Sequence, residues 1–154
     1  MTQEEQQRFV NDLSARLPYG VMVQINGVFH DSQDERLEYV DCFNNQVHIH
    51  GCYFGIDIDN IKPYLRPMTS MTEDEVVEYF RLQTHNEYAD ITGFKIEKTT
   101  LCLTAYVDNV YKWYCWGDIS NIKTFDWLNE RMFDYRGLIY EELALPAPEG
   151  MYKF

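Results

Sequence analysis

The sequence lacks the features that send a chain into or through a membrane. Its first ten residues contain no basic stretch followed by an apolar run, so they do not form a signal peptide. No apolar run comes near the roughly 20 residues that span a bilayer. We therefore expect a cytoplasmic protein that does not bind membranes.

Signatures of catalysis are missing as well. The chain contains no GxGxxG, Walker A, GxSxG or HExxH string. The four cysteines (Cys42, Cys52, Cys102 and Cys115) form no CxxC pair. Without a secretory signal we expect them to be reduced thiols that pack as small hydrophobic side chains. These absences favour a protein that has no cofactor and is not an enzyme.

Basic residues are scarce. The chain has 13 Lys and Arg against 25 Asp and Glu, a formal charge of −12, and residues 1–90 hold 16 of the acids but only 6 of the bases. Such a field repels phosphate groups, so we expect no direct binding of nucleic acid. In the simplest interpretation the charge keeps the protein in solution. A sharper hypothesis is that residues 1–90 imitate DNA and engage a basic protein.

Apolar side chains, in contrast, are plentiful. Hydrophobic residues make up 45% of the 154 positions and aromatic residues 16%. A chain of this length buries roughly 70% of its extended surface on folding, so its stability requires neither a metal nor a disulfide. We expect one compact domain over residues 1–154, with subdomains 1–70 and 71–154 as the alternative.

The first half predicts a helix followed by strands. Thr2 and Glu5 form a capping box, which marks the start of an N-terminal helix. Residues 21–58 then alternate in hydrophobicity, as expected for an antiparallel strand meander, and a small barrel is an alternative form of that meander. The expected features within it are a hairpin turn at 26–27, a polar loop over 31–36, and strands over 37–43 and 47–54.

The second half repeats this order. A second capping box, Thr72 with Glu75, predicts a central helix, and Asn121 is suited to cap a C-terminal helix. Between them we expect a second set of antiparallel strands over 94–96, 101–107 and 110–116, with a hairpin turn at Asp108 and Asn109 between the last two. The fold class is therefore α+β. Large apolar side chains predict that residues 62–71 and the tail 134–152 are ordered without regular secondary structure.

One group of residues could hold a metal. On an extended strand His48, His50 and Cys52 would point to the same face, each about 6.5–7 Å from the next. Imidazole and thiolate are good ligands for a zinc-like ion. However, no fourth ligand is identifiable, and Gly51 is positioned to break the alternation of the strand. Chance placement on one hairpin is the simpler explanation.

An aromatic run near the end of the second strand set has two interpretations. It consists of Tyr106, Tyr111, Trp113, Tyr114 and Trp116. Such residues on a sheet could stack nucleic acid bases. A stacking platform also needs Lys and Arg, and only Lys112 is close, so we expect these rings to pack in the core.

Several stretches resemble a known family. They are LSARLPYGV (13–21), KPYLRPMTSMTE (62–73), WLN (127–129), FDYRGLI (133–139) and APEGMY (147–152). In these stretches the chain resembles a family of small proteins from gut bacteria and their phages, to which no activity is assigned. The resemblance covers both ends and the centre of the chain, and it implies an accessory protein of a prophage or another mobile element.

The matching stretches contain four candidate binding residues: Tyr64, Arg66, Tyr135 and Arg136. Tyrosine and arginine are typical anchors of recognition sites. In so acidic a chain we favour the alternative that the arginines pair internally. The leading hypothesis for function is a non-enzymatic module whose partner is another protein. The alternative is a small enzyme or ligand-binding protein that uses His48, His50 and Cys52.

Overall fold

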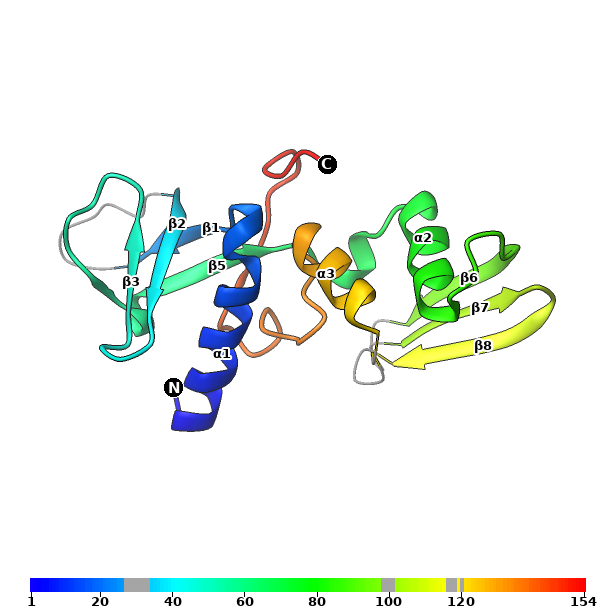
Figure 1. Ribbon diagram of the computed structural model, residues 1–154, viewed down its shortest axis with the longest axis horizontal. Helices are drawn as coiled ribbons and strands as arrows, with labels where there is room; N and C mark the ends of the chain where they lie inside the picture. Colours follow the sequence, from blue (N-terminus) through cyan, green and yellow to red (C-terminus); the bar gives the residue numbers. More distant parts are fainter. Residues whose placement is uncertain (27–33, 98–101, 116–118, 120) are drawn as a thin grey trace.

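A computed structural model describes residues 1–26, 34–97, 102–115, 119 and 121–154. The fold is α+β, as the sequence predicts. The molecule is elongated: a sheet with α1 lies at one end, a second sheet with α2 lies at the other, and α3 lies between them (Figure 1).

Three α-helices begin where the capping signals predict. They are α1 (Gln3–Arg16), α2 (Glu73–Thr84) and α3 (Ile122–Glu130). Both capping boxes form, and the Asn121 side chain accepts a hydrogen bond from the backbone N–H of Lys123. Short 3-10 turns occur at η1 (Leu17–Tyr19), η2 (Ile58–Asn60) and η3 (Met68–Ser70). Within the described residues, no helix is both long and apolar enough to cross a membrane.

The first sheet has six strands in the order β4-β3-β2-β1-β5-β9. Their bounds are β1 (Met22–Ile25), β2 (Asp34–Asp41), β3 (Gln46–Ile49), β4 (Ile56–Asp57), β5 (Ile61–Leu65) and β9 (Leu145–Pro146). All neighbours are antiparallel except β5 and β9. The described strands form an open sheet, so the barrel alternative is not realised.

Three local expectations for this region need correction. The polar loop over 31–36 is too long, because β2 already begins at Asp34. The strand over 47–54 ends at Ile49, since the chain turns at Gly51 with φ of +75°. Two segments expected to lack regular secondary structure contain strands: residues 62–65 belong to β5, although Pro63 supplies no backbone donor, and Leu145–Pro146 in the tail form β9. The predicted turn at 26–27 includes Gly27, which lies outside the described residues.

The second sheet has three antiparallel strands in the order β6-β7-β8. They are β6 (Ile91–Glu97), β7 (Cys102–Val107) and β8 (Val110–Cys115). Asp108 and Asn109 both have positive φ, at 49° and 64°, which is the conformation of a two-residue type I′ hairpin turn. The hairpin expected at these residues is therefore confirmed.

Two hydrophobic clusters form the core. The first lies between α1 and the first sheet and contains Phe9, Leu13, Val23, Leu37 and Leu65 among others. The second lies between α2, α3 and the second sheet and contains Val76, Phe80, Leu103, Leu128 and Phe133 among others. Whether they represent one domain or two subdomains stays a prediction, but the chain does not divide between them at one point.

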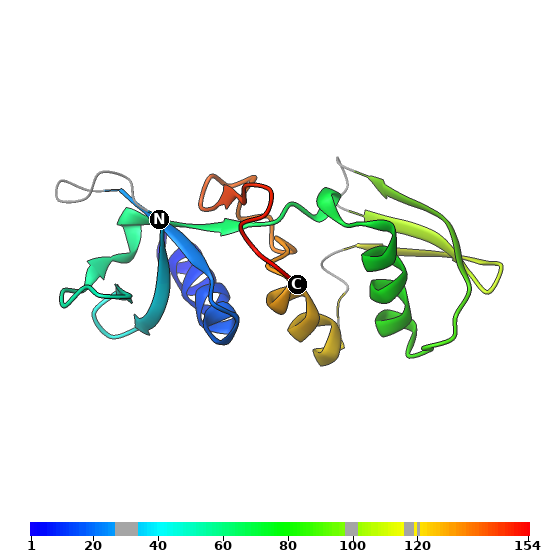
Figure 2. The same ribbon diagram turned by 90° about the horizontal axis from the view of Figure 1, so that it is seen from above.

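The C-terminal segment returns to the first cluster. Met132, Leu138 and Ala144 are buried among residues of the N-terminal 65 positions. In the view from above, this segment runs back from α3 alongside β5 (Figure 2), and β9 pairs with β5 in parallel. The C-terminal segment therefore completes the first cluster, and it follows the residues of the second cluster in the sequence.

Candidate interaction surfaces

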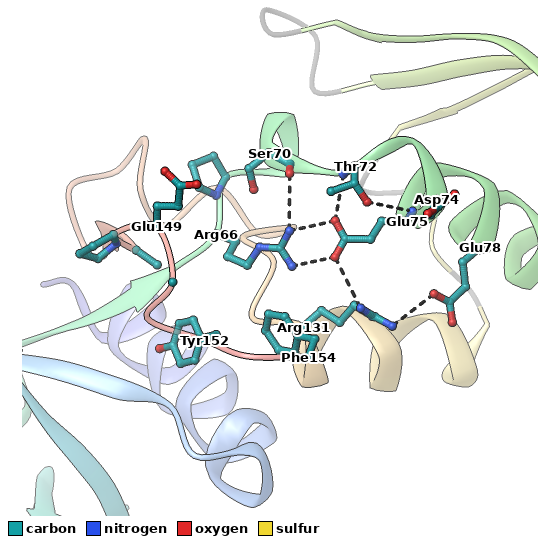
Figure 3. A pocket seen from close by; sticks show the side chains of 14 residues that line it. Arg66, Ser70, Thr72, Asp74, Glu75, Glu78, Arg131, Glu149, Tyr152 and Phe154 are labelled. Atoms are coloured by element: carbon teal, nitrogen blue, oxygen red, sulfur yellow. Dashed lines mark hydrogen bonds and ion pairs between the residues drawn. The ribbon is translucent and has the colours of Figure 1, made fainter.

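Arg66 lies at the junction between the two clusters. It donates two hydrogen bonds of 2.8 Å to the carboxylate of Glu75, one from each terminal nitrogen (Figure 3). The guanidinium also lies 4.2 Å from the ring centroid of Phe133. Such a bidentate pair on an aromatic ring is a strong arrangement for arginine. Arg66 therefore holds its own neighbours together, in agreement with the internal pairing that we favour.

Glu75 is the centre of this junction. Its carboxylate also accepts the backbone N–H of Thr72 at 2.9 Å and lies 3.6 Å from Arg131, which reaches Glu78 as well. Burial by itself would raise the pKa of Glu75, but the bonds from Arg66 and Thr72 outweigh it and hold the pKa below its usual value. The side chain thus stays ionised and joins three segments of the chain.

A cleft of about 630 Å³ opens beside this junction. Its walls come from the residues after β5, the first turns of α2, the end of α3 and the C-terminal segment, including Tyr152 and Phe154. Two arginines line it, but both are neutralised by glutamates that line it too. Both arginines that line the cleft are therefore engaged in ion pairs, and neither presents an unpaired charge to a ligand.

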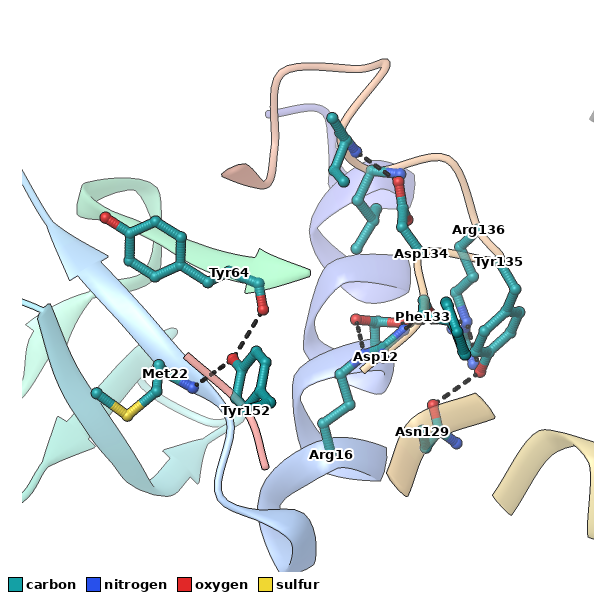
Figure 4. Close-up of polar contacts among 12 residues, drawn as sticks. Asp12, Arg16, Met22, Tyr64, Asn129, Phe133, Asp134, Tyr135, Arg136 and Tyr152 are labelled. Atoms are coloured by element: carbon teal, nitrogen blue, oxygen red, sulfur yellow. Dashed lines mark hydrogen bonds and ion pairs between the residues drawn. The ribbon is translucent and has the colours of Figure 1, made fainter. Parts of the chain in front are cut away.

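A second polar cluster is buried beside α1. Asp12 and Arg16 are completely buried, and the guanidinium donates to both carboxylate oxygens of Asp12, at 2.7 and 3.0 Å (Figure 4). It also donates to the backbone oxygen of Phe133 at 2.9 Å. Burial alone would lower the pKa of Arg16, but the charge of Asp12 raises it. This pair ties the first helix to the segment that follows α3.

Tyr135 and Arg136 extend this cluster. The hydroxyl of Tyr135 donates to the side-chain oxygen of Asn129 at 3.1 Å and accepts from Arg136, whose guanidinium lies 3.4 Å from Asp12. Tyr135 itself is buried. Next to them, Asp134 accepts two backbone N–H groups, at 2.8 Å each, and so fixes the turn at 134–139. Tyr135 and Arg136 therefore meet in space, but in an internal network.

Tyr64 also has internal partners. Its hydroxyl donates to Asp34 at 2.7 Å. Its backbone oxygen accepts from the hydroxyl of Tyr152 at 2.8 Å (Figure 4). The Tyr152 hydroxyl in turn accepts the backbone N–H of Met22 at 3.0 Å. Burial raises the pKa of Tyr152 to about 12. These contacts bind the C-terminal segment to β1 and β5.

The three potential metal ligands do not share a strand face, because β3 ends at Ile49. His48 packs against the ring of Tyr39, with centroids 5.4 Å apart. The exposed His50 pairs with Glu38 at 2.5 Å, and the thiol of Cys52 points to a backbone oxygen at 3.5 Å. Within the part of the chain that the structure describes, no group of three or more His, Cys, Asp or Glu could hold a metal.

The expectation for the cysteines needs two corrections. Cys42 and Cys52 are free thiols, but Cys42 is exposed rather than packed as a small hydrophobic side chain. Cys102 is disulfide-bonded. The expectation of four reduced thiols followed from the absence of a secretory signal, which says nothing about the pairing geometry within a sheet.

The expectation that the aromatic run packs in the core is wrong for three of its residues. Tyr106, Tyr111 and Trp113 expose 47%, 59% and 57% of their surface. Tyr114 alone behaves as expected, because it packs against Phe80 of α2. Trp116 lies outside the described residues. Residues 110–114 do not alternate between apolar and polar side chains, so the sequence does not show which rings face the core.

Register explains why these three rings share one face. Tyr106 pairs with Tyr111 and Thr104 with Trp113, and residues directly opposite on neighbouring strands point to the same side. Leu103, Ala105 and Val107 point to the other side, into the second cluster under α2. The rings therefore lie on the outer face of the sheet, where Tyr106 and Tyr111 meet edge to face at 5.6 Å.

Gly93 makes room for this surface. It has φ of +58°, and a Cβ at this position would lie 3.2 Å from the ring of Tyr106. The register of β6 and β7 shifts between Thr92 and Lys95 at the same place. A glycine bulge thus lets the Tyr106 ring lie against the backbone of β6. On the outer face the Tyr106 ring therefore packs against the backbone of β6 as well as against the ring of Tyr111.

Comparisons with models of protein families, with curated proteins and with solved structures found no match for this chain.

Proposed function

We propose that this chain is a non-enzymatic binding module that docks another protein on the outer face of β6–β8. The observation that carries the proposal is the exposure of Tyr106, Tyr111 and Trp113 on one sheet face. Aromatic side chains are enriched at the centres of protein interfaces, where they bury large areas at a small cost in conformational entropy. A contiguous aromatic surface is therefore better suited to a partner than to water.

The four candidate binding residues from the sequence have a different role in this proposal, which is structural. Tyr64, Arg66, Tyr135 and Arg136 are bound to other residues of the chain, and those contacts join its segments. In this proposal they form the frame that positions the second sheet. The resemblance to phage proteins supports an accessory role whose partner belongs to the host or to the phage.

The test is a comparison of matched variants. Tyr111→Ser/Trp113→Ser removes the rings, and Tyr88→Ser/Tyr140→Ser removes two aromatic side chains that are each 90% exposed elsewhere. A partner candidate is a protein of the producing cells that binds to the wild type and to the Tyr88→Ser/Tyr140→Ser control. The same protein does not bind to the face variant, Tyr111→Ser/Trp113→Ser. A purified candidate should bind the face variant at least about tenfold more weakly, since central aromatic residues dominate interface energies. Equal binding to all three proteins would refute the proposal.

A further inference from the structure

The outer face of the second sheet ends at a free edge. In the described part of the chain β8 pairs only with β7. An edge strand presents backbone N–H and C=O groups that lack a strand partner, and extended peptides bind to such edges by adding a strand. Two of the rings described above, those of Tyr111 and Trp113, lie on this same strand.

The hairpin geometry determines which backbone groups face the open edge. In a two-residue hairpin the residues that flank the turn, Val107 and Val110, form a hydrogen-bonded pair. Hydrogen-bonded and non-hydrogen-bonded pairs alternate along antiparallel strands. The backbone groups of Tyr111 and Trp113 therefore point away from β7. The same two residues place their rings on the outer face.

Lys112, between them, points to the opposite face. It pairs with Ala105 in the register and is exposed. No ion pair joins Lys112 to a carboxylate of the described residues. A strand added at the edge would bring one side chain directly opposite this ammonium group, and an acidic side chain there would be favourable. The overall charge opposes this only weakly, because residues 91–154 carry 9 acids and 7 bases.

We propose that β8 binds an extended segment of a partner protein as a fourth strand of this sheet. The segment has β-branched or aromatic side chains at the two positions that face Tyr111 and Trp113, and a carboxylate between them that faces Lys112. This inference rests on the proposed function and specifies the partner chemistry of the same surface.

A second copy of the chain fits this edge less well. Antiparallel self-pairing centred on Lys112 places two ammonium groups opposite each other, which is unfavourable. Each copy also carries a formal charge of −12. A lysine in the middle of an edge strand is a common protection against such self-association.

The experiment uses the whole chain labelled with ¹⁵N and the acetylated peptide STTIEITTS. Its two isoleucines correspond to the positions that face Tyr111 and Trp113, and its glutamate to the position that faces Lys112. We expect amide shifts concentrated on β8 and a measurable Kd. A peptide with lysine in place of the glutamate should bind about two- to fivefold more weakly to the wild type. The Lys112→Glu variant should reverse this preference.

Methylation of peptide nitrogens separates strand addition from ring contact without altering the protein. Methyl groups on the two isoleucine nitrogens remove the donors that face β8, so at least tenfold weaker binding is expected. A methyl group on the glutamate nitrogen, which faces away from β8, leaves strand addition possible and should preserve binding.

Four results would overturn the inference. Equal binding of both methylated peptides, or shifts on the rings without shifts of the β8 amides, would exclude strand addition but leave the aromatic face as a docking surface. No binding at millimolar peptide would exclude strand addition by such a segment. Sedimentation of the free chain as a dimer that Lys112→Glu alters would identify a second copy as the occupant.

Discussion

The two hydrophobic clusters are built from different side chains. Among the buried residues of the first cluster the single aromatic side chain is Phe9, and the others are aliphatic or Met. The second cluster contains five buried aromatic side chains: Tyr79, Phe80, Trp127, Phe133 and Tyr135. Aliphatic side chains pack without polar atoms, whereas tyrosine and tryptophan bring polar atoms that need partners.

This difference shows where each cluster keeps its polar contacts. In the second cluster they come partly from aromatic residues, as when Gln83 donates to the hydroxyl of Tyr79 at 3.2 Å, and partly from buried polar residues such as Thr124, which donates to Gln83 at 3.1 Å. In the first they come from one charged pair, Asp12 and Arg16, at the edge of an apolar core. The buried polar contacts of the first cluster therefore depend on one ion pair, whereas those of the second cluster are spread over several residues.

The largest expected effect tests how far the first cluster depends on the ion pair of Asp12 and Arg16. Asp12→Ala leaves the buried guanidinium of Arg16 without its carboxylate, and we expect a loss of about 3–5 kcal/mol in the free energy of unfolding. Urea denaturation measures it. Asp12→Ala/Arg16→Met removes both charges and should lose clearly less, while Arg8→Ala breaks an exposed pair and should cost under about 1 kcal/mol. A double variant less stable than Asp12→Ala would show that the pair itself is favourable.

The next effect concerns high pH. Tyr152 has a pKa of about 12 in the folded chain, against 10.0 as the ordinary value. Because the unfolded chain loses this proton first, the contribution of Tyr152 to stability is constant below pH 10 and falls by up to about 1.4 kcal/mol per pH unit between 10 and 12. Thermal unfolding across this range should show a shallower decline for Tyr152→Phe. Tyr140→Phe, at an exposed position, should behave like the wild type.

A third test addresses the junction between the clusters. Glu75→Gln keeps the shape of the side chain but removes its charge, and we expect a loss of about 2 kcal/mol from the weakened bonds with Arg66. The pKa of Glu75 is lowered by folding, so its contribution is present above the unfolded pKa and is lost as the pH falls through the folded value. Acid unfolding should therefore be less steep in Glu75→Gln, with Glu78→Gln as a control.

The smallest effect separates the outer face from the core beneath it. Trp113→Thr should change the free energy of unfolding by less than about 1 kcal/mol, since the ring is more than half exposed. Phe80→Leu, on the buried side, should cost clearly more because it leaves a cavity. Urea denaturation of the two variants gives the comparison. A large loss in Trp113→Thr would mean that the rings serve stability rather than binding.

Local signals in the sequence predicted local structure well. The capping boxes at Thr2 and Thr72 and the turn at Asp108 each depend on residues within a few positions of one another. The sequence did not reveal that Pro63 lies in a strand between β1 and β9, because its partners are far along the chain. For the same reason it could not show that three rings face outward, since this depends on how α2 and α3 pack against the other face of the sheet.

The return of the C-terminal segment to the first cluster has a consequence for the order of folding during synthesis. The hairpin of β7 and β8 closes over two residues and can form as soon as it leaves the ribosome. The first cluster needs Met132, Leu138 and Ala144, and the bond between Met22 and Tyr152 joins residues 130 positions apart. Closing so long a loop adds an entropic cost that local contacts do not have. The part of the chain that is made first is therefore the part that finishes folding last.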